Sequence, residues 1–149
     1  MYVYEYLKKT DLNYFLADRY SFDKKNKIIT HSFVDGENGE FYLFNHIPLK
    51  KEQLNSLKKF YITYKNVPQN IILDIHPGNF IWNEKNEKWI IIDLGMLPTI
   101  GREYYDYNTF EEYYNNIWIK REETMKKIPI RSLDFSLNLD VKDKVLKYE

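Results

Sequence analysis

The apolar residues of the chain repeat with helical spacing in two long segments. In residues 50–65, apolar side chains recur at every third or fourth position and lysines occupy the opposite face, which predicts an amphipathic helix. In residues 109–127, Thr109 and Glu112 have the spacing of a capping box. The apolar face of this second helix would consist of Phe110, Tyr113, Tyr114, Ile117 and Met125. A looser helical pattern covers residues 4–20, where Asp11 would interrupt the helix or cap a second one.

Two other regions are rich in residues that favour strands and are punctuated by turn residues. Residues 28–34 and 40–44 flank the sequence DGENG, whose two glycines suit a turn, and predict a first hairpin. Residues 79–82 and 89–93 flank NEKNEK and predict a second one. Helices and hairpins that follow one another in this order predict an α+β fold rather than a parallel sheet with alternating helices. The segment 128–149 is mixed and predicts at most one short terminal helix.

Composition narrows the class of protein. A chain of 149 residues with 44% hydrophobic residues is expected to form a single domain with its own core. The 22 basic and 22 acidic residues cancel, which argues against a dedicated nucleic-acid-binding protein. The sequence has no cysteine, no signal-peptide pattern and no apolar run near the roughly 20 residues that a membrane span needs. We therefore expect a cytoplasmic protein, or one that is delivered into a host cytosol if it serves as an effector.

The sequence IILDIHPGNFIWNEKNEKWIIIDLG, residues 71–95, places polar side chains at the ends of apolar runs. Asp74 and Asn79 flank a bent segment that contains proline and glycine, and Asp93 follows an aliphatic run. If the second hairpin forms, Asn79 and Asp93 stand at its open end with Asp74 a short loop away. Oxygen ligands of this kind suit Mg²⁺ that completes its shell with phosphate oxygens and water. The alternative for Asp74 alone is a turn-capping aspartate.

This pattern resembles the catalytic core of the protein-kinase-like superfamily, in which Asp-x-x-x-x-Asn precedes a hairpin and an aliphatic strand ends in Asp-x-Gly. The version here looks most like the aminoglycoside and choline phosphotransferases and related compact bacterial kinases. The resemblance implies an ATP- and Mg²⁺-dependent phosphotransferase. Asp74 would orient the acceptor hydroxyl, Asn79 and Asp93 would bind the metal ions on the nucleotide phosphates, and His76 would shape the loop.

The same resemblance extends upstream and implies a division into lobes. EFYLFNHIPL is similar to the fifth strand and hinge of kinases, so that the backbone of Asn45, His46 and Ile47 would bind adenine. Residues 1–44 would then form a reduced small lobe of a helix and a hairpin, 45–49 the hinge, and 50–149 the large lobe. For His46, a plain loop histidine is the alternative.

Several features of the kinase pattern are missing from the sequence. Ile72 stands where kinases usually have histidine, no glycine-rich loop motif occurs, and no lysine matches the phosphate-anchoring position. Glu5 is the one early candidate for that lysine's partner. Three hypotheses follow: a reduced phosphotransferase whose site a protein partner completes, a pseudokinase-like binding or regulatory module, or a fragment of a longer kinase. The acceptor, a protein serine or threonine or a small-molecule hydroxyl, is left open, and the tyrosine pairs at 104–105 and 113–114 are interpreted as packing residues.

Overall fold

A computed structural model describes residues 2–18, 20–94 and 105–127 of the chain. The elements in order are α1 (Tyr2–Leu7), the 3₁₀ turn η1 (Asp11–Phe15), β1 (Tyr20–Asp23), β2 (Ile28–His31), α2 (Gly39–Phe44), α3 (Lys51–Lys65), the 3₁₀ turn η2 (Pro77–Asn79), β3 (Phe80–Asn83), β4 (Lys88–Ile91), α4 (Phe110–Tyr113), the π-helix η4 (Tyr114–Ile119) and α5 (Arg121–Lys127). The described residues form two separate two-stranded antiparallel sheets, β1–β2 and β3–β4. The expected α+β class is confirmed.

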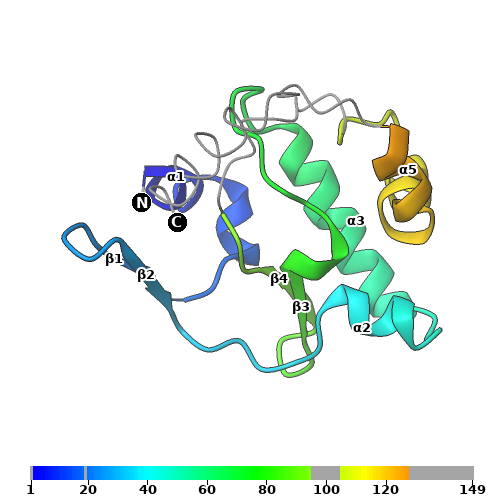
Figure 1. Ribbon diagram of the computed structural model, residues 1–149, viewed down its shortest axis with the longest axis horizontal. Coiled ribbons are helices and arrows are strands. Elements are labelled where there is room, and N and C mark those ends of the chain that lie inside the picture. The colour runs from blue at the N-terminus through cyan, green and yellow to red at the C-terminus, as the bar shows by residue number, and fades with distance from the viewer. Residues whose placement is uncertain (1, 19, 95–104, 128–149) are drawn as a thin grey trace.

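The core forms around α3 and the β3–β4 hairpin, which lie together in the centre of the molecule (Figure 1). Its largest members are aromatic: Phe60 of α3 meets Phe15 and Phe80 edge to face, with ring centroids 5.3 and 4.9 Å away. The buried Trp89 of β4 ties the hairpin to α3, because its indole Nε1 donates to the Gln53 carbonyl at 2.9 Å. Helix 50–65 and the second hairpin therefore form as predicted.

The predicted first hairpin is wrong. Ile28–His31 pairs with the strand that precedes it in the sequence, Tyr20–Asp23, and not with the residues that follow DGENG. Residues 39–44 form the helix α2 instead of a strand. Asn38 begins this helix, since its side chain accepts from the Phe41 N–H at 3.0 Å. The glycines of DGENG serve a different purpose from a hairpin turn. Gly36 has φ of 139° and passes so close to β3 that a Cβ there would lie 1.9 Å from the Trp82 carbonyl oxygen.

The β1–β2 hairpin protrudes from the body, and an extended segment leads from it to α2 on the opposite side (Figure 1). This connecting segment, residues 32–38, runs along β3, where Trp82 N–H donates to the Glu37 carbonyl at 2.9 Å. Val34 in this segment is buried with Ala17 and Ile90. The hairpin itself is tied to the body by Tyr20, whose hydroxyl donates to the Ile92 carbonyl at 3.2 Å.

The helix predicted over residues 109–127 forms as the successive segments α4, η4 and α5 instead of one regular α-helix. Thr109 caps its start by accepting from the Glu112 N–H at 3.1 Å, as the sequence predicts. The π-helix η4 then widens the turn, so that Trp118 packs inward against Gly39, where a Cβ would lie 2.6 Å from the indole. Met125 and the segment 128–149 lie outside the described side chains, and so does Gly95.

Candidate functional site

Residues 71–75 are held by buried tyrosine hydroxyls from two helices. Tyr64 of α3 donates to the Ile71 carbonyl at 3.2 Å and accepts from the Leu73 N–H at 3.0 Å. Tyr113, at the end of α4, donates to the Ile75 carbonyl at 2.6 Å. Because this segment lies outside regular secondary structure, these hydroxyls satisfy backbone groups that a strand partner would otherwise satisfy. They also fix the path of the chain on either side of residue 74.

Asp74 points its carboxylate at two side chains. Its Oδ1 accepts from the Tyr105 hydroxyl at 2.8 Å, and its Oδ2 lies 3.2 Å from His76 Nε2. The side chain is 23% exposed, so one side of the carboxylate faces solvent. Both of these partners are side chains, whereas a turn-capping aspartate binds backbone N–H groups.

His76 is oriented by the loop that it shapes. The Gly78 N–H donates to its Nδ1 at 3.0 Å, so Nδ1 is the unprotonated nitrogen and Nε2 carries the proton in the neutral ring. This Nε2 lies 3.2 Å from Asp74 Oδ2. This agrees with the loop-shaping role that the resemblance implied for His76. Glu40 of α2 lies on the other side of the ring, with Oε1 3.9 Å from Nδ1.

Asn79 is linked to Asp74 by a direct hydrogen bond. Its Nδ2 donates to the Asp74 carbonyl at 2.9 Å, which uses the donor end of the amide and directs the Oδ1 end elsewhere. Its own carbonyl accepts from the Ile92 N–H at 2.9 Å, one step beyond the last β3–β4 pair. Asn79 and the chain leading into Asp93 therefore meet at one end of the hairpin, as the sequence predicts.

Asp93 lies near the base of the protruding hairpin. It follows Ile92, whose carbonyl accepts from the Tyr20 hydroxyl of β1 at 3.2 Å. Burial and then the charge of Asp93 raise the pKa of the Tyr20 phenol above its ordinary value. Tyr20 is stacked against Tyr4, with ring centroids 4.3 Å apart. The aspartate thus stands between the β3–β4 end and the β1–β2 hairpin.

A magnesium site fits the chemistry of this donor set. Asn79 offers an amide oxygen and Asp93 a carboxylate, both hard ligands, and Mg²⁺ commonly takes one or two protein groups and several other oxygens. In residues 2–18, 20–94 and 105–127, no group of three or more histidine, aspartate or glutamate side chains could hold a metal ion.

The structure does not place a strand before Asn45, His46 and Ile47, although the predicted hinge requires one. They follow α2, where Asn45 caps the helix and His46 adopts a left-handed φ of 54°, and all three are exposed. The strand that should precede a hinge is absent at residues 39–44. The adenine-binding role of these three residues stays a prediction, now without the strand that supported it.

The structure brings four further residues to the site. Tyr105 and Tyr113 reach Asp74 and Ile75 from the C-terminal part of the chain, although both were interpreted as packing residues. Glu40 pairs with Arg121, which begins α5. The tyrosine pairs were visible in the sequence, but nothing there indicated which hydroxyl would reach the loop. The Glu40–Arg121 pair spans 81 positions and has no local signal.

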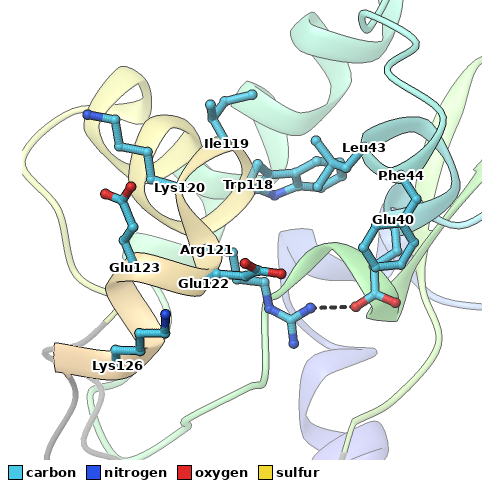
Figure 2. A pocket seen from close by; sticks show the side chains of 10 residues that line it. All are labelled: Glu40, Leu43, Phe44, Trp118, Ile119, Lys120, Arg121, Glu122, Glu123 and Lys126. Carbon is cyan, nitrogen blue, oxygen red and sulfur yellow. Dashed lines mark hydrogen bonds and ion pairs between the residues drawn. The ribbon is translucent and has the colours of Figure 1, made fainter.

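A cleft of about 580 Å³ opens beside this network, between α2 and residues 118–126. Figure 2 shows Leu43 and Phe44 on one wall, Ile119 and Glu123 on the other, and the Glu40–Arg121 pair bridging the two. Phe44 is 72% exposed there. In the described part of the chain, the Arg121 Nε is buried without a hydrogen-bond partner.

No protein-family model, curated protein or solved structure matches this chain significantly. None of the described helices is long and apolar enough to cross a membrane.

Proposed function

We propose that this chain is an ATP- and Mg²⁺-dependent phosphotransferase with a kinase-like arrangement of its catalytic loop. One observation supports this most: Asn79 bonds the Asp74 carbonyl and also joins the end of the hairpin that carries Asp93. Asp74, Asn79 and Asp93, the three residues of the kinase-like motif, therefore lie on backbone segments that are joined by hydrogen bonds.

In this proposal each side chain has a distinct task. The Asp74 carboxylate, oriented by Tyr105 and His76, accepts a hydrogen bond from the acceptor hydroxyl and directs its oxygen at the phosphorus. The Asn79 amide oxygen and the Asp93 carboxylate would bind the Mg²⁺ that accompanies the nucleotide phosphates. Mg²⁺ bound there would neutralise charge on the transferring phosphoryl group. Phosphoryl transfer needs positioning and charge neutralisation more than covalent catalysis, so a compact scaffold suffices.

The nucleotide would enter beside the β1–β2 hairpin rather than beside Asn45. In the kinase-like interpretation, a hinge joins the last small-lobe strand to the first large-lobe helix. Residues 32–38 make that connection here, between β2 and α2, and α2 itself packs on η2 and β3. We therefore move the proposed hinge from 45–49 to 32–38 and the proposed lobe boundary with it.

The acceptor would dock in the cleft between α2 and residues 118–126. Glu40 forms part of that cleft and also lies 3.9 Å from His76, which contacts Asp74. Phe44→Ala is expected to raise the KM for an acceptor and leave ATP affinity unchanged, because this exposed side chain contributes little to the core.

A binding or regulatory module without catalysis is the second candidate. The observation that favours it is the β1–β2 hairpin, a two-stranded sheet that is exposed on one face and at most half-buried on the other and so offers the phosphates little cover. A protein partner would supply that cover. The fragment hypothesis has its own check, because a glycine-rich loop in frame in the upstream coding region would establish it.

Mg²⁺-ATP binding measured by calorimetry tests the nucleotide site. We expect wild type to bind, Asp93→Asn to bind at least about tenfold more weakly, and Asp11→Asn, an exposed aspartate on η1, to bind like wild type. No binding by wild type would refute both candidates that use the nucleotide. Equal binding by wild type and Asp93→Asn would refute the metal role of Asp93. ATP turnover then separates the phosphotransferase from the non-catalytic module.

A further inference from the structure

Four buried tyrosines surround the Asp74 segment, but only one of these hydroxyls is bonded to the Asp74 side chain. Tyr64 and Tyr113 bond backbone groups of residues 71–75. Tyr61 bonds the backbone of the segment that contains Tyr105. Tyr105 instead donates to the carboxylate of Asp74 at 2.8 Å, across 31 positions of sequence. The first three contacts stabilise the fold of the chain, whereas the fourth acts on the side chain that performs the proposed chemistry.

Tyr105 cannot easily leave this position. Its ring is 1% exposed and belongs to the main core. Its carbonyl accepts from the Tyr61 hydroxyl at 3.1 Å, and that hydroxyl also accepts from the Tyr107 N–H at 2.6 Å. Lys65 of α3 adds an ion pair to Asp106 at 3.0 Å. Residues 105–107 are thus bound to α3, which fixes the position of the Tyr105 hydroxyl.

The Tyr105 hydroxyl also keeps its proton. Burial, and then the negative charge of Asp74, raise the pKa of this phenol above its ordinary value. The group therefore remains a donor throughout the range in which enzymes work. An acceptor hydroxyl would need a lone pair on the same carboxylate, and each carboxylate oxygen has two. Tyr105 and the acceptor can accordingly bind Asp74 at the same time.

We propose that Tyr105 is a positioning residue that holds the Asp74 carboxylate in the orientation needed to receive the acceptor hydroxyl, an inference that rests on the proposed phosphotransferase function. Tyr105 donates to one carboxylate oxygen and His76 Nε2 lies 3.2 Å from the other, so a side chain contacts the carboxylate on each side. Without the Tyr105 hydroxyl, Asp74 can rotate about its last torsion angle. The acceptor would then meet a carboxylate with no fixed direction, and small misplacements of this kind are costly.

Tyr105→Phe tests the proposal, with Tyr113→Phe as the matched control. Each variant removes one buried hydroxyl that bonds residue 74 or 75, but Tyr113 bonds the Ile75 carbonyl and Tyr105 the Asp74 carboxylate. The measurements are the thermal midpoint, the Kd for Mg²⁺-ATP and the kcat for turnover of γ-labelled ATP. We expect Tyr105→Phe to lower kcat by about tenfold or more while its Kd for Mg²⁺-ATP stays within about twofold of wild type. Tyr113→Phe should lose at least as much thermal stability and less kcat.

Each other outcome overturns the inference. Wild-type kcat in Tyr105→Phe means that the hydroxyl does not position Asp74. A parallel loss of nucleotide affinity and kcat, or a Tyr105→Phe chain that does not fold although Tyr113→Phe does, assigns the hydroxyl to general stability. A wild-type chain without turnover defeats the proposed function itself, and this result is distinct because it appears before any substitution is made.

Discussion

The Asp74 segment and the β1–β2 hairpin are both short stretches that contribute to the proposed site, but they are held in different ways. Residues 71–75 have no strand partner over most of their length, yet tyrosine hydroxyls from α3 and α4 bind them inside the core. The hairpin has its own ladder, with strands that are exposed or half-buried on both faces. Irregular backbone can thus be more firmly fixed than a regular sheet, because burial and satisfied polar groups decide its stability.

The difference has a functional meaning. The catalytic-loop side of the proposed site is built by the chain's own core, whereas the side that would cover a nucleotide depends on a hairpin with few supporting contacts. A two-stranded hairpin alone is marginally stable in water. A bound nucleotide or a partner would therefore order the hairpin more than it orders the loop.

The largest expected effect comes from removing the core beneath the loop. Trp89→Ala deletes a fully buried indole that also bonds the Gln53 carbonyl. It should cost about 3–5 kcal/mol of unfolding free energy in urea titrations, because a large cavity and a lost hydrogen bond combine. A loss below about 1 kcal/mol would mean that the hairpin and α3 do not form one core.

Removing one anchoring hydroxyl should have a smaller effect. The Tyr113 hydroxyl donates to the Ile75 carbonyl and accepts from the Trp118 indole N–H at 3.1 Å. Tyr113→Phe leaves both buried partners unpaired, so we expect a loss of about 1–3 kcal/mol, again by urea unfolding. A variant as stable as wild type would show that the tyrosines do not anchor the loop.

High pH should weaken the same anchors. Burial first of all raises the pKa values of Tyr105 and Tyr113, so the folded chain keeps protons that the unfolded chain releases above pH 10.0, the ordinary tyrosine value. This contribution to stability is complete below that pH and is lost as the pH rises further. From about pH 10 to about pH 11, Tyr105→Phe should lose about 1 kcal/mol less than wild type, measured by urea unfolding at each pH. Equal losses would contradict the buried, protonated state of Tyr105.

The smallest effect is expected in the protruding hairpin. Ile28 of β2 is 51% exposed, so Ile28→Ala should change the unfolding free energy by no more than about 0.5 kcal/mol. Hydrogen exchange provides a second measurement, with amides of β1–β2 exchanging faster than those of β3–β4. Equal exchange rates for the amides of the two hairpins would contradict the expected difference in their stability.

The sequence predicted the elements whose pattern is local. Helix α3 and the β3–β4 hairpin have clear periodicity and turn residues, and the Ile92 N–H bonds the Asn79 carbonyl at the end of that hairpin. The joint metal-binding role of Asn79 and Asp93 stays a prediction. Residues 39–44 were misassigned because FYLF suits a strand as well as a helix, and two neighbouring glycines resembled a hairpin turn. The helical conformation of residues 39–44 depends instead on the Asn38 side-chain cap and on the tertiary contact of Gly36 with Trp82.

The partners of Asp74 could not be predicted for a similar reason. The Tyr105 hydroxyl reaches Asp74 across 31 positions, and its direction depends on how Tyr61 and Lys65 hold residues 105–107. Fourteen tyrosines make the presence of such contacts probable in any fold of this chain, but they do not indicate which one forms. The motif therefore indicated Asp74, whereas the side chains that contact it follow only from the packing.

The most direct test of the central claim is turnover of γ-labelled ATP with Mg²⁺ by wild type, Asp74→Ala and the exposed-site control Asp11→Asn. The account predicts measurable turnover by wild type and the control, and a loss of at least about a hundredfold in Asp74→Ala with Mg²⁺-ATP binding retained. Turnover by Asp74→Ala at the wild-type rate, or no turnover by a wild-type chain that binds Mg²⁺-ATP, would contradict it.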